Sequence, residues 1–250
     1  MAVEQGEYVL IAGANGSGKS TLARHLNGLL LPTSGEVRIM GRPTHDPEDI
    51  MEIRYAVGYV FQNPENQIVA GVVQDDVAFG PENLGLDPSE TRIRVEESLR
   101  AVHLWNLRER SVFALSGGEK QRLALAGVLA MRPRCIVLDE PCSLLDGAAR
   151  KGILDLLAQF NREHGTAIIY FTHDLAEIGA ARRVVLLAGG CLVADGRPAD
   201  LLPEAHLLKS FGLEAPPLAV VGELLRSAGV LVPRRALSVK EMVEALCGSG

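Results

Sequence analysis

The stretch from Tyr8 to Thr21, YVLIAGANGSGKST, constrains the fold more than any other part of the sequence. It opens with an apolar run from Tyr8 to Ala12 that predicts a buried strand, and the segment from Gly13 to Ser20 fits the pattern GxxxxGKS. Three leucines then follow at helical spacing: Leu22, Leu26 and Leu29. The stretch therefore predicts a strand, a glycine-rich loop and a helix in direct succession.

The residues of this loop suit the binding of phosphate. Glycines let successive backbone N–H groups turn inward as a nest for phosphate oxygens, and the helix that follows adds the positive end of its dipole. The Lys19 ammonium would lie on the β- and γ-phosphates, and the Ser20 hydroxyl would be one ligand of Mg²⁺. The alternative is a turn that merely joins a strand to a helix. We expect a nucleoside triphosphate to bind at Gly13, Asn15, Gly16, Ser17, Gly18, Lys19, Ser20 and Thr21.

Composition narrows the class of protein. A chain of 250 residues with 47% hydrophobic residues can bury a full core, and its formal charge of −6 disfavours nucleic acid or an anionic lipid surface as its partner. The four cysteines lack CxxC spacing, so we expect neither a zinc site nor a disulfide framework, which fits a reducing cytosol. No apolar run approaches the roughly 20 residues that cross a bilayer, so we expect any membrane role to be peripheral.

Alternating strand and helix patterns predict an α/β fold with a mostly parallel sheet. We expect strands near residues 36–40, 56–61, 135–138, 166–171, 184–188 and 191–194, the last two forming a hairpin, and a surface loop at 42–52. Residues 63–132 have helical patterns only, including a helix that starts at Asp87. We expect a nucleotide-binding core of residues 1–62 and 133–200, a helical subdomain of residues 63–132, and a C-terminal appendage of residues 201–250.

Polar residues follow several of the predicted strands, where parallel sheets carry their ligand sites. Asp139 and Glu140 end one strand, so Asp139 can face Mg²⁺ through water while Glu140 activates a water in line with the γ-phosphate. Gln62 could contact Mg²⁺ and this water, and His173 could bind the water or the γ-phosphate. The alternatives are a solvated acidic pair and a structural histidine.

The segment LSGGEKQR, residues 115–122, predicts a second helix that begins with an anion-binding N-terminus. The chain thus has two anion-binding helix N-termini, one after the glycine loop and one near Ser116, and they are far apart in the sequence. This favours a two-fold dimer in which the Ser116 end of each chain closes on the glycine loop of the other. The contact across the dimer would come from Ser116, Gly117, Gly118 and Glu119. The alternative is a capped surface helix.

Together these motifs resemble the nucleotide-binding subunit of an ATP-binding-cassette (ABC) transporter, a P-loop NTPase. GANGSGKST resembles the Walker A loop, LSGGEKQR the family signature and CIVLDEP the Walker B strand, with Glu140 as catalytic base. SLLD, residues 143–146, resembles the D-loop that ends at Asp146, Gln62 matches the Q-loop and His173 the switch histidine. The resemblance implies an ATPase that dimerises around two ATP molecules and drives transport.

A narrower resemblance is to the ATPases of energy-coupling-factor importers of vitamins, cobalt or nickel. It rests on FQNPENQIV at residues 61–69, DDVAFGPENLGL at 75–86 and the segment 233–246. It implies a second ATPase, identical or paralogous, a membrane scaffold, a substrate-binding membrane subunit, and a place at the cytoplasmic side of the cell membrane. Asp75 and Asp76 are candidates for ion pairs with the scaffold.

Two features depart from the family. Its members usually begin with a further strand and an aromatic residue that stacks on adenine, before the strand that corresponds to Tyr8–Ala12 here. The sequence therefore predicts either that the start codon is assigned too late or that the protein is a shortened form. Cys142 stands where serine or threonine is common, a change that should leave the site intact. The alternatives are an ABC ATPase of another transporter class, a non-hydrolysing regulatory subunit, and a soluble cassette ATPase acting on nucleic acid, which the acidic charge disfavours.

Overall fold

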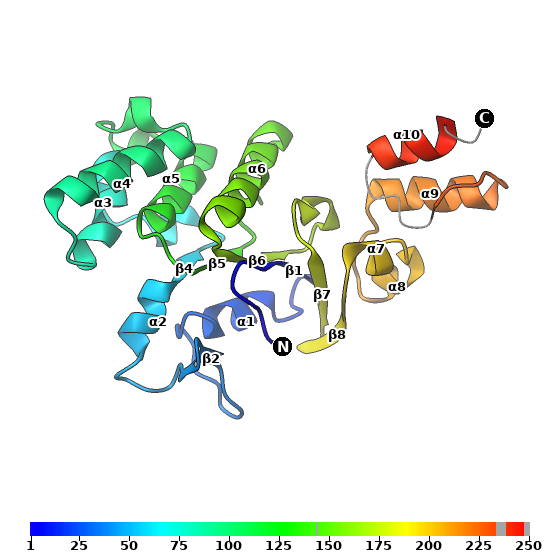
Figure 1. Ribbon diagram of the computed structural model, residues 1–250, viewed down its shortest axis with the longest axis horizontal. Coiled ribbons are helices and arrows are strands. Elements are labelled where there is room, and N and C mark those ends of the chain that lie inside the picture. Colours follow the sequence, from blue (N-terminus) through cyan, green and yellow to red (C-terminus); the bar gives the residue numbers. More distant parts are fainter. Residues whose placement is uncertain (144, 234–238, 248–250) are drawn as a thin grey trace. The chain divides into compact units, whose positions relative to one another are not determined.

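The computed structural model describes residues 1–143, 145–233 and 239–247 (Figure 1). Leu144 of the predicted D-loop and residues 234–238 and 248–250 of the predicted appendage lie outside the described residues. The chain forms two compact units, one made of Met1–Tyr8 and Ser20–Phe171, the other of Val9–Lys19 and Thr172–Gly250. In the part of the chain that the structure describes, no helix is both long enough and apolar enough to span a membrane.

The first unit contains the parallel strands β4 (Val57–Val60), β5 (Cys135–Asp139) and β6 (Ala167–Thr172). Every residue of β4 and β6 is buried, as expected for strands covered on both faces. Their register aligns Val60 with Leu138 and Leu138 with Tyr170, so β4 and β5 end at the same edge. This alignment brings the residues that follow β4 next to the carboxylates at the end of β5.

Helices make up most of the rest of this unit. They are α1 (Lys19–His25), α2 (Ile50–Ala56), α3 (Val73–Asn83), α4 (Pro88–Ala101), α5 (Gly117–Ala130) and α6 (Gly147–His164). Figure 1 shows α3, α4 and α5 packed together, and their inward side chains Val77, Leu99 and Leu123 are fully buried. The predicted helix starts after Asp87 and Ser116 are confirmed, and α6 ends at Gly165, whose φ of 63° is left-handed.

The second unit contains β1 (Tyr8–Ala12), β7 (Arg183–Ala188) and β8 (Cys191–Gly196). β1 pairs with β7 in parallel, and β7 pairs with β8 as the predicted hairpin. Gly189 and Gly190 form its turn with φ values of 55° and 79°, which other residues adopt at a cost. Short helices follow: α7 (Pro198–Leu201), α8 (Ala205–Ser210), α9 (Pro217–Ser227) and α10 (Val239–Cys247). Leu225 of α9 packs against a small cluster of Val232 and Met242, the latter in α10.

Two local expectations are wrong. The helix after the glycine loop ends at His25, because the chain turns there: Leu29 and Leu30 donate their backbone N–H groups to the Arg24 carbonyl. Leu29 is 41% exposed, so the predicted leucine stripe does not continue. The region 42–52, expected as loop, holds β3 (Arg42–Pro43), which pairs with β2 (Arg38–Ile39), and the start of α2.

Candidate functional site

The glycine loop of the second unit is closely packed and needs its glycines. Gly13 donates its N–H to the Thr172 carbonyl at 3.2 Å, and a side chain there would lie 2.5 Å from the Leu187 carbonyl oxygen. Gly16 and Gly18 have φ values of 78° and 102°, which L-residues rarely adopt. The loop therefore adopts its close-packed conformation because these three positions are glycine.

The Lys19 side chain folds back on this loop and binds its backbone. Its Nζ donates to the carbonyl oxygens of Gly13 at 2.8 Å and Ala14 at 3.2 Å, and the residue is only 5% exposed. The ammonium is thus held over the loop, where it can attract a phosphate. Ser17 is buried in the same loop, whereas Asn15 and Thr21 are exposed.

In the first unit, Asp139 at the end of β5 accepts two hydrogen bonds. The Ser20 hydroxyl donates to its Oδ1 at 3.0 Å, and the Tyr59 hydroxyl donates to its Oδ2 at 3.1 Å. Burial raises the pKa of Asp139, while the bonds from Ser20 and Tyr59 oppose this shift. The sequence prediction joined Ser20 and Asp139 but missed Tyr59; a hydroxyl within an apolar strand was the available signal.

Glu140 faces a different partner from its neighbour Asp139. Gln62 Nε2 donates to Glu140 Oε2 at 3.3 Å, and the Glu140 N–H donates to the Phe171 carbonyl at 3.0 Å. Glu140 has a φ of 49°, a left-handed conformation that is uncommon outside glycine. Because the backbone turns at Glu140, the Asp139 carboxylate contacts Ser20 and Tyr59 while the Glu140 carboxylate contacts Gln62. The two carboxylates can therefore have separate roles.

The LSGGEKQR segment forms a complete capping box at the start of α5. The Ser116 hydroxyl donates to Glu119 Oε2 at 2.8 Å and accepts from the Glu119 N–H at 3.3 Å. The Ser116 backbone N–H also donates to Glu119 Oε2, at 2.7 Å, and this bond, together with the one from the Ser116 hydroxyl, lowers the pKa of Glu119. Gly117 is exposed and Gly118 partly so, which leaves the helix end open to a ligand.

Three other predicted site residues have distinct surroundings. Asp146 caps α6, because its Oδ1 accepts from the Ala149 N–H at 2.8 Å. His173 follows β6 and is exposed. Asp76 is 9% exposed, and its Oδ1 accepts from the backbone N–H groups of Val69 and Ala70, so its predicted pairing with a membrane subunit is wrong. Its neighbour Asp75 is exposed.

The donor set of the first unit fits a hard divalent cation such as Mg²⁺. The Ser20 hydroxyl, the Asp139 carboxylate and the Gln62 side-chain amide all offer oxygen, the ligand type that Mg²⁺ prefers. Among the described residues, no three His, Cys, Asp or Glu side chains form a cage for a metal. Mg²⁺ is usually held by one or two protein groups together with substrate phosphates.

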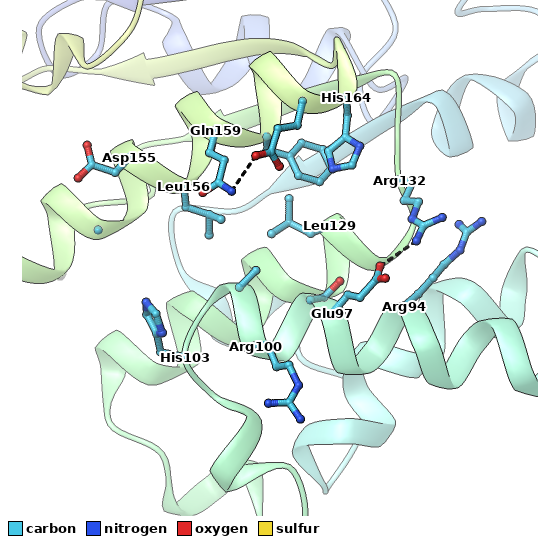
Figure 2. A pocket seen from close by; sticks show the side chains of 15 residues that line it. Arg94, Glu97, Arg100, His103, Leu129, Arg132, Asp155, Leu156, Gln159 and His164 are labelled. Atoms are coloured by element: carbon cyan, nitrogen blue, oxygen red, sulfur yellow. Dashed lines mark hydrogen bonds and ion pairs between the residues drawn. The ribbon is translucent and has the colours of Figure 1, made fainter.

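A groove of about 510 Å³ lies between α4, α5 and α6 and is lined by none of the predicted site residues (Figure 2). Arg132 contacts Glu97 at 2.8 Å, and Arg94 contacts Glu90 at 2.7 Å. Because these opposite charges neutralise one another, we assign the groove no ligand.

Comparisons with known proteins identify relatives of this chain. A model of the ABC transporter family matches residues 1–143. The energy-coupling factor transporter ATP-binding protein EcfA1 of Symbiobacterium thermophilum is 50% identical over 245 residues, or 98% of this chain and 85% of that protein. EcfA1 of Caldanaerobacter subterraneus is 46% identical over 98% of this chain and 88% of its own length.

Two solved structures are also similar. One is cbiO1 from Clostridium perfringens, part of the ABC transporter complex cbiONQ, with a TM-score of 0.76 and 35% identity over 89% of this chain and 90% of that chain. The other is the dimeric post-hydrolysis state of the ATP-binding cassette MJ0796 with ADP and Pi, with a TM-score of 0.73 and 31% identity over 79% of this chain and 88% of that chain. The chain therefore belongs to the ABC transporter family, as an ATPase similar to the ATP-binding proteins of energy-coupling factor transporters.

Proposed function

We propose that this chain binds and hydrolyses ATP to power an energy-coupling-factor importer of a micronutrient, either a metal ion or a vitamin. The observation that carries the proposal is the pair of hydrogen bonds at the end of β5, where Ser20 binds Asp139 and Gln62 binds Glu140. A metal-facing carboxylate beside a second carboxylate for water is the arrangement that phosphoryl transfer to water requires.

Each group has a role on the nucleotide. The phosphates are bound by the Lys19 ammonium and by N–H groups of the glycine loop other than those of Gly13 and Ser17, which bond to the carbonyls of Thr172 and Ala14. Ser20 and Asp139 would hold Mg²⁺, Asp139 through a water, and Gln62 would add its amide oxygen. Mg²⁺, when bound with ATP, neutralises the charge that develops on the phosphate oxygens.

Hydrolysis then depends on Glu140. Its carboxylate accepts a proton from a water whose oxygen attacks the γ-phosphorus, the bond to the β-phosphate oxygen breaks, and ADP and phosphate leave. Gln62 and His173 orient this water or the γ-phosphate. Residues around Glu140 hold the carboxylate in place, since its backbone is bonded to Phe171 and its side chain to Gln62.

We propose that the active form is a dimer, either of two copies or of this chain with a paralogue. The end of α5, with Ser116, Gly117, Gly118 and Glu119, binds the ATP held by the other chain, with Asp146 near the same contact. The solved MJ0796 cassette, which is dimeric and bound to ADP and Pi, supports this arrangement.

A membrane scaffold and a substrate-binding membrane subunit complete the proposed complex, which places the chain peripherally at the cytoplasmic side of the cell membrane. The membership of cbiO1 in the cbiONQ complex supports such partners. Exposed apolar side chains gather near the Q-loop: Val69 is 61% and Phe113 is 84% exposed, and the Val112 N–H donates to the Gly71 carbonyl beside them. Asp75, exposed at the start of α3, adds a negative charge for a basic partner.

The first experiment measures the mass of the Glu140→Gln chain in solution by light scattering, with and without Mg-ATP. A doubling of mass that requires ATP supports the homodimer, and a persistent monomer points to a paralogue. Steady-state hydrolysis by the assembled complex is the second measurement. No turnover by a complex with intact Glu140 would contradict the proposal and favour a regulatory subunit.

A further inference from the structure

Two side chains near the end of β4 bind the two consecutive carboxylates at the end of β5. Tyr59 donates to Asp139 at 3.1 Å, and Gln62 donates to Glu140 at 3.3 Å. The parallel register of β4 and β5, which sets Tyr59 opposite Val137, brings these pairs together. Gln62 has a role in the proposed hydrolysis, whereas the proposed function assigns no role to Tyr59.

Tyr59 is held rigidly and stays protonated. The residue is 7% exposed, and its ring lies 4.6 Å from the ring of Phe61, centroid to centroid. A tyrosine hydroxyl, with an ordinary pKa of about 10, keeps its proton at neutral pH and so donates to Asp139. A donor that is held rigidly on a buried strand defines one direction for its acceptor.

Asp139 therefore has both oxygens fixed. Oδ1 accepts from Ser20 and Oδ2 accepts from Tyr59, which together set the plane of a carboxylate that is only 3% exposed. With Tyr59 absent, one buried oxygen loses this donor, and the carboxylate can rotate toward another. Partners of this kind orient the groups that bind a metal.

We propose that Tyr59 is a positioning residue that holds Asp139 in the orientation required to bind the metal of Mg-ATP. This inference rests on the proposed function, because it assigns Asp139 to the metal. Tyr59 touches neither substrate nor metal; it acts through Asp139.

The test compares Tyr59→Phe with Tyr55→Phe in the full chain. Tyr55 is a matched control, because its hydroxyl donates to the backbone carbonyl of Asn83, at 3.4 Å, rather than to a carboxylate. Mn²⁺ serves as the probe, and its affinity for the chain saturated with ADP is measured by electron paramagnetic resonance. ADP affinity in EDTA and the unfolding midpoint are measured in parallel.

We expect Tyr59→Phe to weaken Mn²⁺ binding by roughly 10-fold to 100-fold, while ADP affinity in EDTA stays unchanged and Tyr55→Phe matches the wild type. In the assembled complex, excess Mg²⁺ should restore hydrolysis by Tyr59→Phe. The inference would be overturned if Tyr59→Phe bound Mn²⁺ as tightly as the wild type. It would also be overturned if Tyr59→Phe lost as much affinity for ADP in EDTA as it lost for Mn²⁺. Failure of the wild-type complex to hydrolyse ATP would instead contradict the proposed function, so the two failures are distinguishable.

Discussion

The side-chain amide of Gln62 donates to the carboxylate of Glu140 at 3.3 Å, from the end of one parallel strand to the end of the next. Gln62 begins the segment that leads to Val69 and Asp75, where we place the membrane partner. A shift of this segment would therefore move the group that holds the proposed catalytic base. This contact offers a physical route by which motion in the membrane subunits alters hydrolysis.

Glu140→Gln should lower kcat for ATP hydrolysis by about 10²-fold to 10⁴-fold and leave ATP binding intact, because the amide keeps the shape but accepts no proton. Phosphate release by the assembled complex and nucleotide binding measure the two effects. Glu96→Gln on α4, where Glu96 pairs with Arg100 at the surface, is the control and should hydrolyse normally. Normal turnover by Glu140→Gln would remove Glu140 from its assigned role.

Lys19→Ala should weaken ATP binding by about 10-fold to 100-fold, because a hydrogen bond to a charged group contributes about 1.5–3 kcal/mol. The substitution also removes the donor to the Gly13 and Ala14 carbonyls, so the loop itself becomes less ordered. Equilibrium binding of ATP gives the measurement. Lys151→Ala, which removes an exposed lysine paired with Asp155, should bind ATP as the wild type does. Equal affinities for both variants would contradict the assignment of Lys19.

Gly13→Ala should lower the free energy of unfolding by about 1–3 kcal/mol and weaken ATP binding, because the added carbon would lie 2.5 Å from the Leu187 carbonyl oxygen and closer still to Ser17 Oγ. Gly127→Ala is the matched control: its added carbon meets nothing within 4 Å, and it lies inside α5. There alanine should raise stability by about 1 kcal/mol. Denaturant unfolding of both variants checks the opposite signs.

Ser116→Ala should lower the free energy of unfolding by about 1 kcal/mol, because it breaks the capping box of α5. Ser111→Ala is the control, since Ser111 precedes a short helical turn without a side-chain cap bond and should change little. Urea unfolding of both chains gives the measurement, and equal losses would contradict the role of the cap.

The same box makes a pH prediction. The bonds from Ser116 lower the pKa of Glu119 in the folded chain, so the contribution of Glu119 is present above its unfolded pKa of about 4.3 and is lost as the pH falls through the lowered folded value. The stability difference between wild type and Glu119→Gln should therefore shrink at acid pH. A difference that grows on acidification would contradict this sign.

The sequence by itself determined the elements whose signals are local. The glycine loop, the hairpin turn at Gly189 and Gly190, the cap at Ser116 and the stop at Gly165 follow from residue type at single positions, because glycine conformation and capping act over a few residues. Buried parallel strands were predictable for the same reason, since a short apolar run bounded by polar residues has few other uses.

Only the tertiary structure decided which side chains meet. Tyr59 and Asp139 are 80 positions apart, and their bond depends on the register of β4 against β5, which no local pattern specifies. Asp75 and Asp76 look alike in the sequence, yet Asp76 is buried under the backbone of Val69 and Ala70 while Asp75 is exposed. Burial and hydrogen-bond partners arise from contacts between distant segments, so the exposure of a carboxylate and the partners it accepts from are properties of the folded chain alone.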